Sequence, residues 1–445
     1  MRNIWLTLAV FMAALVCSCG IVNTAISISS ISPSGGTTLG GTEVTITGQN
    51  FGSAATVEFG SVPAVVTSSE STKIVVISPP SADATGAVDV TVTNAKADTV
   101  TRKGGFTYVS MLACVDRDSG DVALFDVDSA NNTFAAFSKS PFAAGGNAPR
   151  GIAADRSNQF LFVTNGNSST VSVFEYSAEE GLLTAVSGSP FAANAVGPVA
   201  VALDVMAQLA FVANFTSNSV SVFSYDAATG AMTLDGTTPT GASGIQPVDV
   251  EVDSGARLLF VANSGSNTVS VFDYATDGVL TEVVGSPFAA GGFAPNALAV
   301  DTALRVLFIA NSTSNTISVM QYDANGKLTA TAGSPFAAGG AQPFDVALDR
   351  TRAFLFAANA ASSTVTSFSY DTAGFLTPSP GLAPSSGGLS PTALAVDETN
   401  SALYVSNSGS NDVQAMTYDL AGTLTTVGNT VASGGRAPYG LVFIP

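Results

Sequence analysis

Three carboxylates stand out because the positions that correspond to them elsewhere in the chain carry no charge. Asp249, Glu251 and Asp345 lie in short apolar segments whose counterparts have Gly, Ala or Val at the same places. With the amide of Asn296, they offer the oxygen ligands that a hard cation such as Ca²⁺ takes in sets of about six to eight. The pattern predicts a candidate metal site at Asp249, Glu251 and Asp345. The alternative is that these acids are solvated groups in a wet channel.

A second group of residues is suited to binding an anion. Arg150, Arg436 and Tyr439 each lie within two residues of a proline that recurs along the chain. A guanidinium binds a carboxylate or a phosphate through paired hydrogen bonds. The predicted ligand-binding residues are therefore Arg150, Asp249, Glu251, Asn296, Asp345, Arg436 and Tyr439, and no residue is assigned a catalytic role.

The composition excludes several kinds of chemistry. The 445 residues include 33 Asp and Glu against 15 Lys and Arg, a formal charge of −18, and no histidine. An acidic chain repels phosphate backbones, which excludes nucleic acid as a partner. No step can use an imidazole as base, acid or metal ligand. Only 11% of the residues are charged and 46% are hydrophobic, which favours a packed core over disorder.

Residues from about 110 onward repeat at a period of 47–49 residues, and this repeat positions the candidate residues. A proline begins the first strand of each unit, and an Asn or Asp ends the second; the prolines are Pro149, Pro198, Pro247, Pro295, Pro343, Pro391 and Pro438. Seven units of four strands at this period predict a seven-bladed β-propeller over 110–445, so the fold class is all-β. The first unit lacks its first strand, and the chain ends on a first strand. Residues 437–445 are therefore expected to complete the blade that begins at Met111 and to close the ring.

The first strand of each blade lines the central channel of a propeller, with alternate residues facing it. One alternate set is apolar and is expected to pack between blades: Ile152, Val201, Val250, Leu298, Val346, Leu394 and Leu441. The other set has small side chains except at Asp249, Glu251 and Asp345, which places these three acids in the channel. An Asp that ends the first strand in six units, as at Asp155 and Asp204, is predicted to accept backbone hydrogen bonds in a turn.

Residues 26–109 form a separate unit of short alternating strands, predicted at 44–47, 56–59, 73–76 and 87–92. Ile31-Ser32-Pro33, Gly48-Gln49-Asn50-Phe51-Gly52 and Gly105-Phe106-Thr107-Tyr108 closely resemble motifs of the IPT/TIG family. The resemblance implies an immunoglobulin-like β-sandwich that serves as a spacer or a protein-contact module.

The repeats resemble the YVTN family of seven-bladed propellers, which includes lactonase-like proteins. Phe162-Val163-Thr164-Asn165 and Tyr404-Val405-Ser406-Asn407 are variants of its signature. The related lactonases use a Pro-Arg-His run at the channel mouth, whereas this chain has Pro149-Arg150-Gly151. The resemblance therefore leaves two hypotheses open: a non-catalytic binding or scaffold module for a protein, glycan or small ligand, or a lactonase-like hydrolase of the 6-phosphogluconolactonase type that lacks the family's histidine.

The N-terminus predicts export. Residues 1–18 contain an apolar run too short to span a bilayer, and they end in Val16-Cys17-Ser18-Cys19, which resembles the lipobox of bacterial lipoproteins. An ordinary secretory signal is the alternative. In the first case Cys19 carries the lipid, residues 19–25 form a linker, and the membrane is a partner through the anchor. The expected location is the outer membrane or the cell surface, with an orientation toward the periplasm left open.

Overall fold

The computed structural model describes residues 25–445, apart from residues 82–84, 130, 179 and 241–243. The expected signal peptide and the lipidation site at Cys19 lie outside the described residues. Within the described ranges, none of the chain forms a helix with the length and apolar character needed to cross a membrane.

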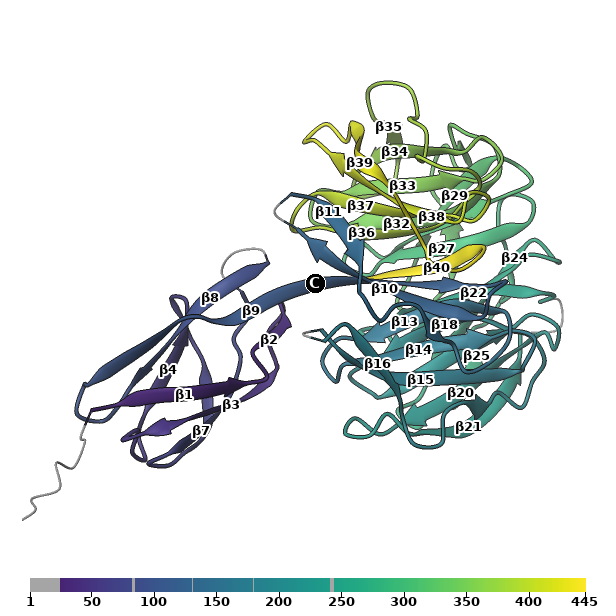
Figure 1. The fold of residues 1–445 in the computed structure, drawn as a ribbon. Helices are drawn as coiled ribbons and strands as arrows, with labels where there is room; N and C mark the ends of the chain where they lie inside the picture. Colours follow the sequence, from purple (N-terminus) through teal and green to yellow (C-terminus); the bar gives the residue numbers. More distant parts are fainter. Residues whose placement is uncertain (1–24, 82–84, 130, 179, 241–243) are drawn as a thin grey trace, which may run out of the picture.

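The N-terminal part is a sandwich of two sheets (Figure 1). The first sheet has the order β1 (Ser27–Ser32), β3 (Glu43–Gln49), β7 (Lys73–Ile77) and β6 (Val65–Ser69). The second contains β9 (Thr99–Asp116), β8 (Gly86–Thr93), β4 (Thr56–Phe59) and β5 (Val62–Pro63), with β2 (Gly35–Thr37) parallel to β9. Alternate apolar residues of both sheets, such as Val44, Ile74 and Phe106, are fully buried between them.

Six blades of the propeller are continuous in sequence, and their strands lie in chain order from the centre outward. Blade 2 has β13 (Pro149–Asp155), β14 (Phe160–Asn165), β15 (Thr170–Ser177), β16 (Leu182–Ala185) and β17 (Phe191–Ala192). Blade 3 has β18 (Pro198–Asp204), β19 (Leu209–Asn214), β20 (Ser219–Tyr225) and β21 (Met232–Pro239). Blade 4 has β22 (Pro247–Asp253), β23 (Leu258–Asn263), β24 (Thr268–Tyr274), β25 (Leu280–Glu282) and β26 (Phe288–Ala289).

The remaining continuous blades follow the same plan. Blade 5 has β27 (Pro295–Asp301), β28 (Val306–Asn311), β29 (Thr316–Tyr322), β30 (Leu328–Ala330) and β31 (Phe336–Ala337). Blade 6 has β32 (Pro343–Asp349), β33 (Phe354–Asn359), β34 (Thr364–Tyr370) and β35 (Leu376–Pro378). Blade 7 has β36 (Pro391–Asp397), β37 (Ala402–Asn407), β38 (Asp412–Tyr418) and β39 (Leu424–Ala432).

Blade 1 joins the two ends of the propeller. Its innermost strand is β40 (Pro438–Ile444), which pairs antiparallel with β9; β10 (Asp121–Asp128), β11 (Thr133–Ala136) and β12 (Phe142–Ala143) complete the blade. The first strands contact their neighbours all the way round, including β36 with β40 and β40 with β13. The described residues thus form a closed ring of seven blades, and the predicted all-β sandwich and propeller are confirmed.

The second strand of each continuous blade is wholly buried, because sheets pack on both of its faces. The apolar residues expected to pack between blades do so, each within one of the clusters that join neighbouring blades; Val250 of blade 4, for example, is in one cluster with Leu209 and Phe211 of blade 3. We call the face at which the first strands begin the Pro rim, after the seven prolines, and the opposite face the Asp rim.

Strand β9 fixes where the sandwich attaches. Pro438 pairs with Asp116 and Ile444 with Met111, so Met111 lies at the Asp rim. The strand continues from Met111 back to Thr99 in the sandwich as one ribbon (Figure 1). The sandwich is therefore connected on the Asp rim side, and the Pro rim faces away from it.

Candidate functional site

A cavity of about 650 Å³ runs through the centre of the ring. First strands from every blade line it, and their small residues, such as Gly151, Ala200 and Ala202, leave it open. Of the seven predicted ligand-binding residues, six line this cavity: Arg150, Asp249, Glu251, Asn296, Asp345 and Tyr439. The seventh, Arg436, is exposed beside the mouth at the Pro rim and does not line the cavity.

The mouth at the Pro rim is built around Tyr439. The guanidinium carbons of Arg117 and Arg150 each lie 5.4 Å from the centre of its ring, and the ring of Phe344 meets it edge-on at 5.5 Å. Burial raises the pKa of Tyr439, and the two nearby arginines oppose that rise. Two cations held on one aromatic ring make a preorganised positive patch, which fits a carboxylate or a phosphate.

The side chain of Asn296 forms a hydrogen bond within the wall of the cavity. Its amide Nδ2 donates a hydrogen bond of 2.6 Å to the carbonyl of Phe344 in the next blade. Thr392, at the same position of blade 7, likewise donates 2.7 Å to the carbonyl of Pro438. These side chains tie neighbouring blades together at the mouth, and the oxygen and the second N–H of the Asn296 amide are left to meet a ligand.

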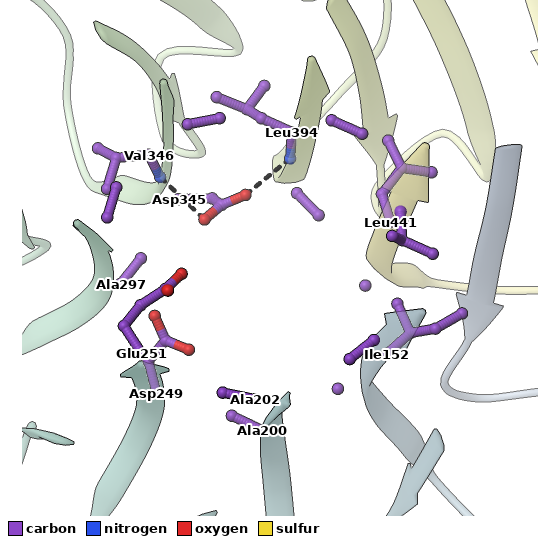
Figure 2. Close-up of a pocket in the computed structure, with 18 of the residues that line it drawn as sticks. Ile152, Ala200, Ala202, Asp249, Glu251, Ala297, Asp345, Val346, Leu394 and Leu441 are labelled. Atoms are coloured by element: carbon purple, nitrogen blue, oxygen red, sulfur yellow. Dashed lines mark hydrogen bonds between the residues drawn. The ribbon is translucent and has the colours of Figure 1, made fainter. Parts of the chain in front are cut away.

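Two of the three acids also bridge blades. One oxygen of Asp345 accepts a hydrogen bond from the backbone nitrogen of Leu394 at 2.7 Å, and the other accepts from Val346 at 2.8 Å (Figure 2). Asp249 does the same with Leu298 at 2.7 Å and Val250 at 2.9 Å. Burial raises the pKa of each carboxyl to about 7, against the lowering effect of these hydrogen bonds. Both acids line the cavity, but their carboxylates are turned along its wall.

Glu251 is the acid that is not tied to the neighbouring blade. Its side chain extends from β22 into the cavity beside Asp249 (Figure 2). Burial first, and then the negative charge of Asp249, raise its pKa to about 8, while Arg350 lowers it. A carboxyl with a pKa near neutrality can donate or accept a proton at physiological pH.

The predicted metal site is not assembled in the described residues. No group of three or more Asp, Glu, Cys or His side chains in these ranges is arranged to hold a metal ion. The hydrogen bonds of Asp249 and Asp345 to backbone nitrogens explain why, since they hold the two carboxylates against the wall instead of turning them toward a common centre.

A second charged group lines the cavity at the Asp rim. Arg156 donates 2.8 Å to the carbonyl of Phe443, and Arg350 donates 3.0 Å to the carbonyl of Val300. Arg350 also lies 3.8 Å from Glu398. Burial lowers the pKa of Arg156. Because both arginines donate hydrogen bonds to backbone carbonyls, they stabilise the ring at the Asp rim.

Sequence reasoning missed four of the cavity and mouth residues. Phe344 follows Pro343, the same position as Arg150, Asn296 and Tyr439, and Arg156 and Arg350 both follow the Asp that ends a first strand. Phe344, Arg156 and Arg350 could therefore have been identified by aligning the repeats. Arg117 could be found only by joining the first blade to the last strand, because its contact with Tyr439 depends on the pairing of β9 with β40.

Position 151, where the lactonase resemblance places a histidine, has no room for a side chain. A Cβ atom there would lie 2.7 Å from the backbone Cα of Ala200 and 2.8 Å from the carbonyl oxygen of Val199. Both are backbone atoms of the next blade, so a larger residue would force the blades apart. The missing histidine is thus accompanied by a local geometry that excludes it.

Comparison with known proteins agrees with this architecture. Residues 27–108 match the family model for the IPT/TIG domain, and residues 189–293 and 285–384 match that for the seven-bladed β-propeller lactonases. No protein of curated function matches the sequence. In structure, the chain is similar to a Bacteroides fragilis protein provisionally classed as a 6-phosphogluconolactonase, with 18% identity, a TM-score of 0.66, and coverage of 76% of this chain and 98% of that one.

Two further solved structures show the same likeness. The periplasmic gluconolactonase of Pseudomonas aeruginosa shares 19% identity, with a TM-score of 0.63 and coverage of 76% of this chain and 99% of that chain. A Lactobacillus plantarum protein shares 20% identity at a TM-score of 0.63, with the same coverage. At these identities the likeness establishes the fold.

Proposed function

Since the chain joins an IPT/TIG domain to a lactonase-like propeller, we propose that it is an exported binding protein whose propeller recognises an anionic group at the Pro rim without catalysing its reaction. The observation that carries this proposal is the pair of guanidinium groups, Arg117 and Arg150, held at 5.4 Å from the ring of Tyr439. Such a stack fixes two guanidinium groups at the mouth of a cavity. Arg117 also pairs with Asp118 at 2.9 Å, so Arg150 supplies the positive charge for a carboxylate or phosphate ligand.

The chemistry of the cavity supports binding over hydrolysis. Opening a lactone ring needs a group that activates water, and proton transfer of this kind contributes about 10²–10⁴-fold in rate. Asp249 and Asp345 have their oxygens engaged by backbone nitrogens, and position 151 has no room for a base. Among the described residues, the mouth therefore has charges for binding an anion, while Glu251, two residues further along its strand than Asp249, is the cavity acid left to transfer a proton.

A ligand screen tests this proposal. We expect inorganic phosphate, gluconate or 6-phosphogluconate to raise the melting temperature of the wild type, and neutral glucose to leave it unchanged. Arg150→Ala should abolish the shift, because it removes one of the two charges on Tyr439. Lys327→Ala, which removes an exposed positive charge from a hairpin at the Asp rim, should retain it. An equal shift in wild type and Arg150→Ala, or none with any anion, would refute anion recognition at the mouth.

A lactonase-like hydrolase is the second candidate, and Glu251 is the observation that favours it. Its carboxyl lies in the cavity with a pKa raised to about 8, as an acid catalyst at neutral pH requires. Glucono-δ-lactone and 6-phosphogluconolactone are suitable substrates for the assay. Turnover above the rate in buffer that Glu251→Gln removes would establish the hydrolase and displace the non-catalytic proposal.

Export and anchoring form a separate part of the proposal. We propose that Cys19 carries a lipid that holds the protein at the outer membrane or cell surface, where a protein or a glycan would also be accessible as a partner. Labelling of growing cells with a palmitate analogue should mark the wild type. Cys19→Ser should lose the label and be recovered in the soluble fraction, whereas Cys114→Ser should keep it, since Cys114 is buried in the propeller.

A further inference from the structure

The seven loops that lead into the first strands share one conformation. In each loop the residue two before the proline donates its backbone N–H to a serine hydroxyl in the turn after the second strand, at 2.6–3.1 Å; the seven donors are Asn147, Val196, Ile245, Phe293, Ala341, Leu389 and Arg436. The residue just before the proline has a positive φ in every loop, from 52° at Ala148 to 75° at Gly197. The seven donor residues are therefore displayed at equivalent places around the Pro rim.

Five consecutive blades display an apolar side chain at this place. Val196, Ile245, Phe293 and Leu389 are 54%, 49%, 65% and 59% exposed, and Ala341 between the last two is partly exposed. We call these five residues the apolar crescent. Apolar side chains that are exposed singly are ordinary, but a row of them held by the same rigid loop marks an interaction surface.

The two remaining blades complete the ring with polar residues. Their loops display Arg436 and Asn147, next to Arg117 and Arg150 at the mouth. Arg117 is paired with Asp118 at 2.9 Å, and Asp118 is the exposed acid of this sector. Asp116 is buried and Asp121 is partly buried in the same blade, so three guanidinium groups face one exposed carboxylate. We call Arg117, Arg150 and Arg436 the arginine sector.

The charge of the Pro rim differs from that of the rest of the protein. Among the seven loops before the prolines and the seven turns after the second strands, the only charged residues are Arg117, Asp118 and Arg436. The hairpins between third and fourth strands at the Asp rim instead carry an Asp or a Glu in six of the seven blades, and the whole chain has a charge of −18. A cationic sector on such a background selects an acidic partner over other surfaces.

We propose that the Pro rim is a docking face for a second protein, whose contact surface is apolar opposite the crescent and acidic opposite the arginine sector. The inference rests on the proposed role as a binding protein, but it concerns a surface outside the cavity. An apolar row beside arginines and a tyrosine has a composition typical of protein interfaces, in which aromatic residues and Arg are enriched. The sandwich attaches at the opposite rim, so nothing in the described chain covers this face.

A protein fits this surface better than a lipid or a glycan. A sugar-binding face uses several exposed aromatic rings, and the crescent has one, Phe293. A bilayer that anchors the chain through its N-terminus lies on the side of the sandwich, away from the Pro rim. The seven loops share one hydrogen-bonded backbone conformation, which suits a preformed, folded partner, since little ordering of the backbone is required on binding.

Site-specific photo-crosslinking in the cells that produce the protein tests the docking face. The photoreactive amino acid p-benzoylphenylalanine replaces Phe293 or Leu389 in the crescent, and Phe375, an exposed residue of a hairpin at the Asp rim, as the control position. We expect both crescent positions to form an adduct with the same protein, identified by mass spectrometry, and Phe375 to form none with it. Arg436→Glu in the Phe293 background should reduce the adduct about tenfold, since it reverses one charge of the sector.

The identified protein is then purified for a binding assay with the full-length chain. Phe293→Ser should weaken its affinity about tenfold and Leu420→Ser, at the Asp rim, should leave it unchanged. Adducts with lipid, polysaccharide or a second copy of this chain overturn the proposal, as does equal crosslinking at Phe375 or no adduct at all. The two proposals can fail separately. If the docking face is refuted but Arg150→Ala still abolishes the anion-induced rise in melting temperature, the proposal of anion binding beside Tyr439 stands.

Discussion

The hydroxyl of Tyr274 donates a hydrogen bond of 2.7 Å to the carboxylate of Asp204 in the preceding blade. The same contact joins four other pairs of blades, at 2.7–3.0 Å: Tyr225 to Asp155, Tyr322 to Asp253, Tyr370 to Asp301 and Tyr418 to Asp349. Each Asp also accepts backbone N–H groups of its own turn, as Asp204 does from Met206 and Ala207. One carboxylate thus shapes a turn and links two blades.

Blade 2 breaks this pattern at the closure of the ring. Its tyrosine, Tyr176, faces Ile444, which stands where the other first strands have Asp. Its hydroxyl is buried without a hydrogen-bond partner, and burial raises its pKa. The pattern therefore contains its own control, a tyrosine that packs at an equivalent place without the hydrogen bond.

Replacing the two tyrosines by phenylalanine should have opposite effects on stability. Tyr274→Phe removes a hydrogen bond to a buried carboxylate and should lower the free energy of unfolding by about 1–2 kcal/mol. Tyr176→Phe removes an unpartnered buried hydroxyl and should leave stability unchanged or raise it. Denaturant titration of both variants measures the difference. Equal changes in the two variants would show that the hydrogen bond from Tyr274 to Asp204 contributes no more than an unpartnered hydroxyl does.

The turn role of these aspartates could be predicted from the sequence, but the tyrosine contact could not. An Asp that ends a strand at every repeat indicates a turn, because turn geometry is local. Tyr274 lies 70 residues after Asp204, and only the packing of one blade on the next brings them together. Local patterns identified the strands and the ring, while contacts between blades needed the structure.

The candidate site shows the same limit. The repeat aligned the first strands, so it identified the residues that line the cavity. It did not show that Asp249 and Asp345 turn along the wall. Each first strand is the inner edge of its sheet, and some of its N–H groups, such as that of Leu298, have no strand to bond with. The carboxylates of Asp249 and Asp345 accept hydrogen bonds from these N–H groups. The sequence of a single blade does not show which N–H groups of the next blade need an acceptor.

Stability should fall as the pH rises from about 5 to about 8. The pKa values of Asp249 and Asp345 are raised to about 7 and that of Glu251 to about 8 in the folded protein, above their values near 4 in an unfolded chain. The folded protein therefore retains protons that the unfolded chain has released, and this contribution is lost as the pH passes through the folded values. Because the cavity admits water, we expect a total loss of about 1–3 kcal/mol.

Denaturant titration at pH 5 and pH 8 measures this loss. Glu251→Gln removes one titrating group and should reduce the difference between the two pH values, since an amide has no proton to release. Glu180→Gln, in an exposed hairpin, is the matched control and should not change it. Stability that rises between pH 5 and pH 8 would contradict the raised pKa values of the cavity acids.

Calcium should not change the stability of the protein. Asp249 and Asp345 are engaged by backbone nitrogens, and no acidic cluster among the described residues is arranged for a metal. Addition of millimolar Ca²⁺, or its removal by a chelator, should leave the melting temperature within experimental error. A clear rise with Ca²⁺ that Glu251→Gln abolishes would restore the cavity metal site that the sequence suggested.

Removal of the last strand should open the ring. Residues 438–445 contain β40, which supplies the inner strand of blade 1 and contacts β13 and β36 on either side. Truncation after Ala437 exposes the edge of β9, and unpaired edges promote unfolding or association. We expect the propeller to melt at least 10 °C lower or to form oligomers on gel filtration, while loss of Pro445 alone has little effect. A truncated chain that melts like the full one would mean that β40 does not close the ring.

Asp116 should weaken this closing blade at high pH. It pairs with Pro438 of β40, and it stands where the other blades have an Asn whose amide donates to a side chain of the third strand. In blade 7, Asn407 donates 2.8 Å to Asp412. In blade 1 the equivalent pair is Asp116 and Asp121, two acids. Burial first, with Asp121 adding to it, raises the pKa of Asp116 to about 6, although Ser433 and Gly435 oppose the rise.

Asp116→Asn should therefore stabilise the protein by about 1 kcal/mol at pH 8 and have little effect at pH 5, where Asp116 is itself protonated. The amide can donate to Asp121, as the amide of Asn407 does to Asp412. Asn407→Asp is the reciprocal variant, which places two acids in blade 7, and it should destabilise the protein by a similar amount at pH 8. Denaturant titrations of both at the two pH values decide the matter. If Asp116→Asn destabilises the protein at pH 8, the prediction is wrong. The hydrogen bonds from Ser433 and Gly435 would then stabilise the ionised carboxylate of Asp116 by more than its burial destabilises it.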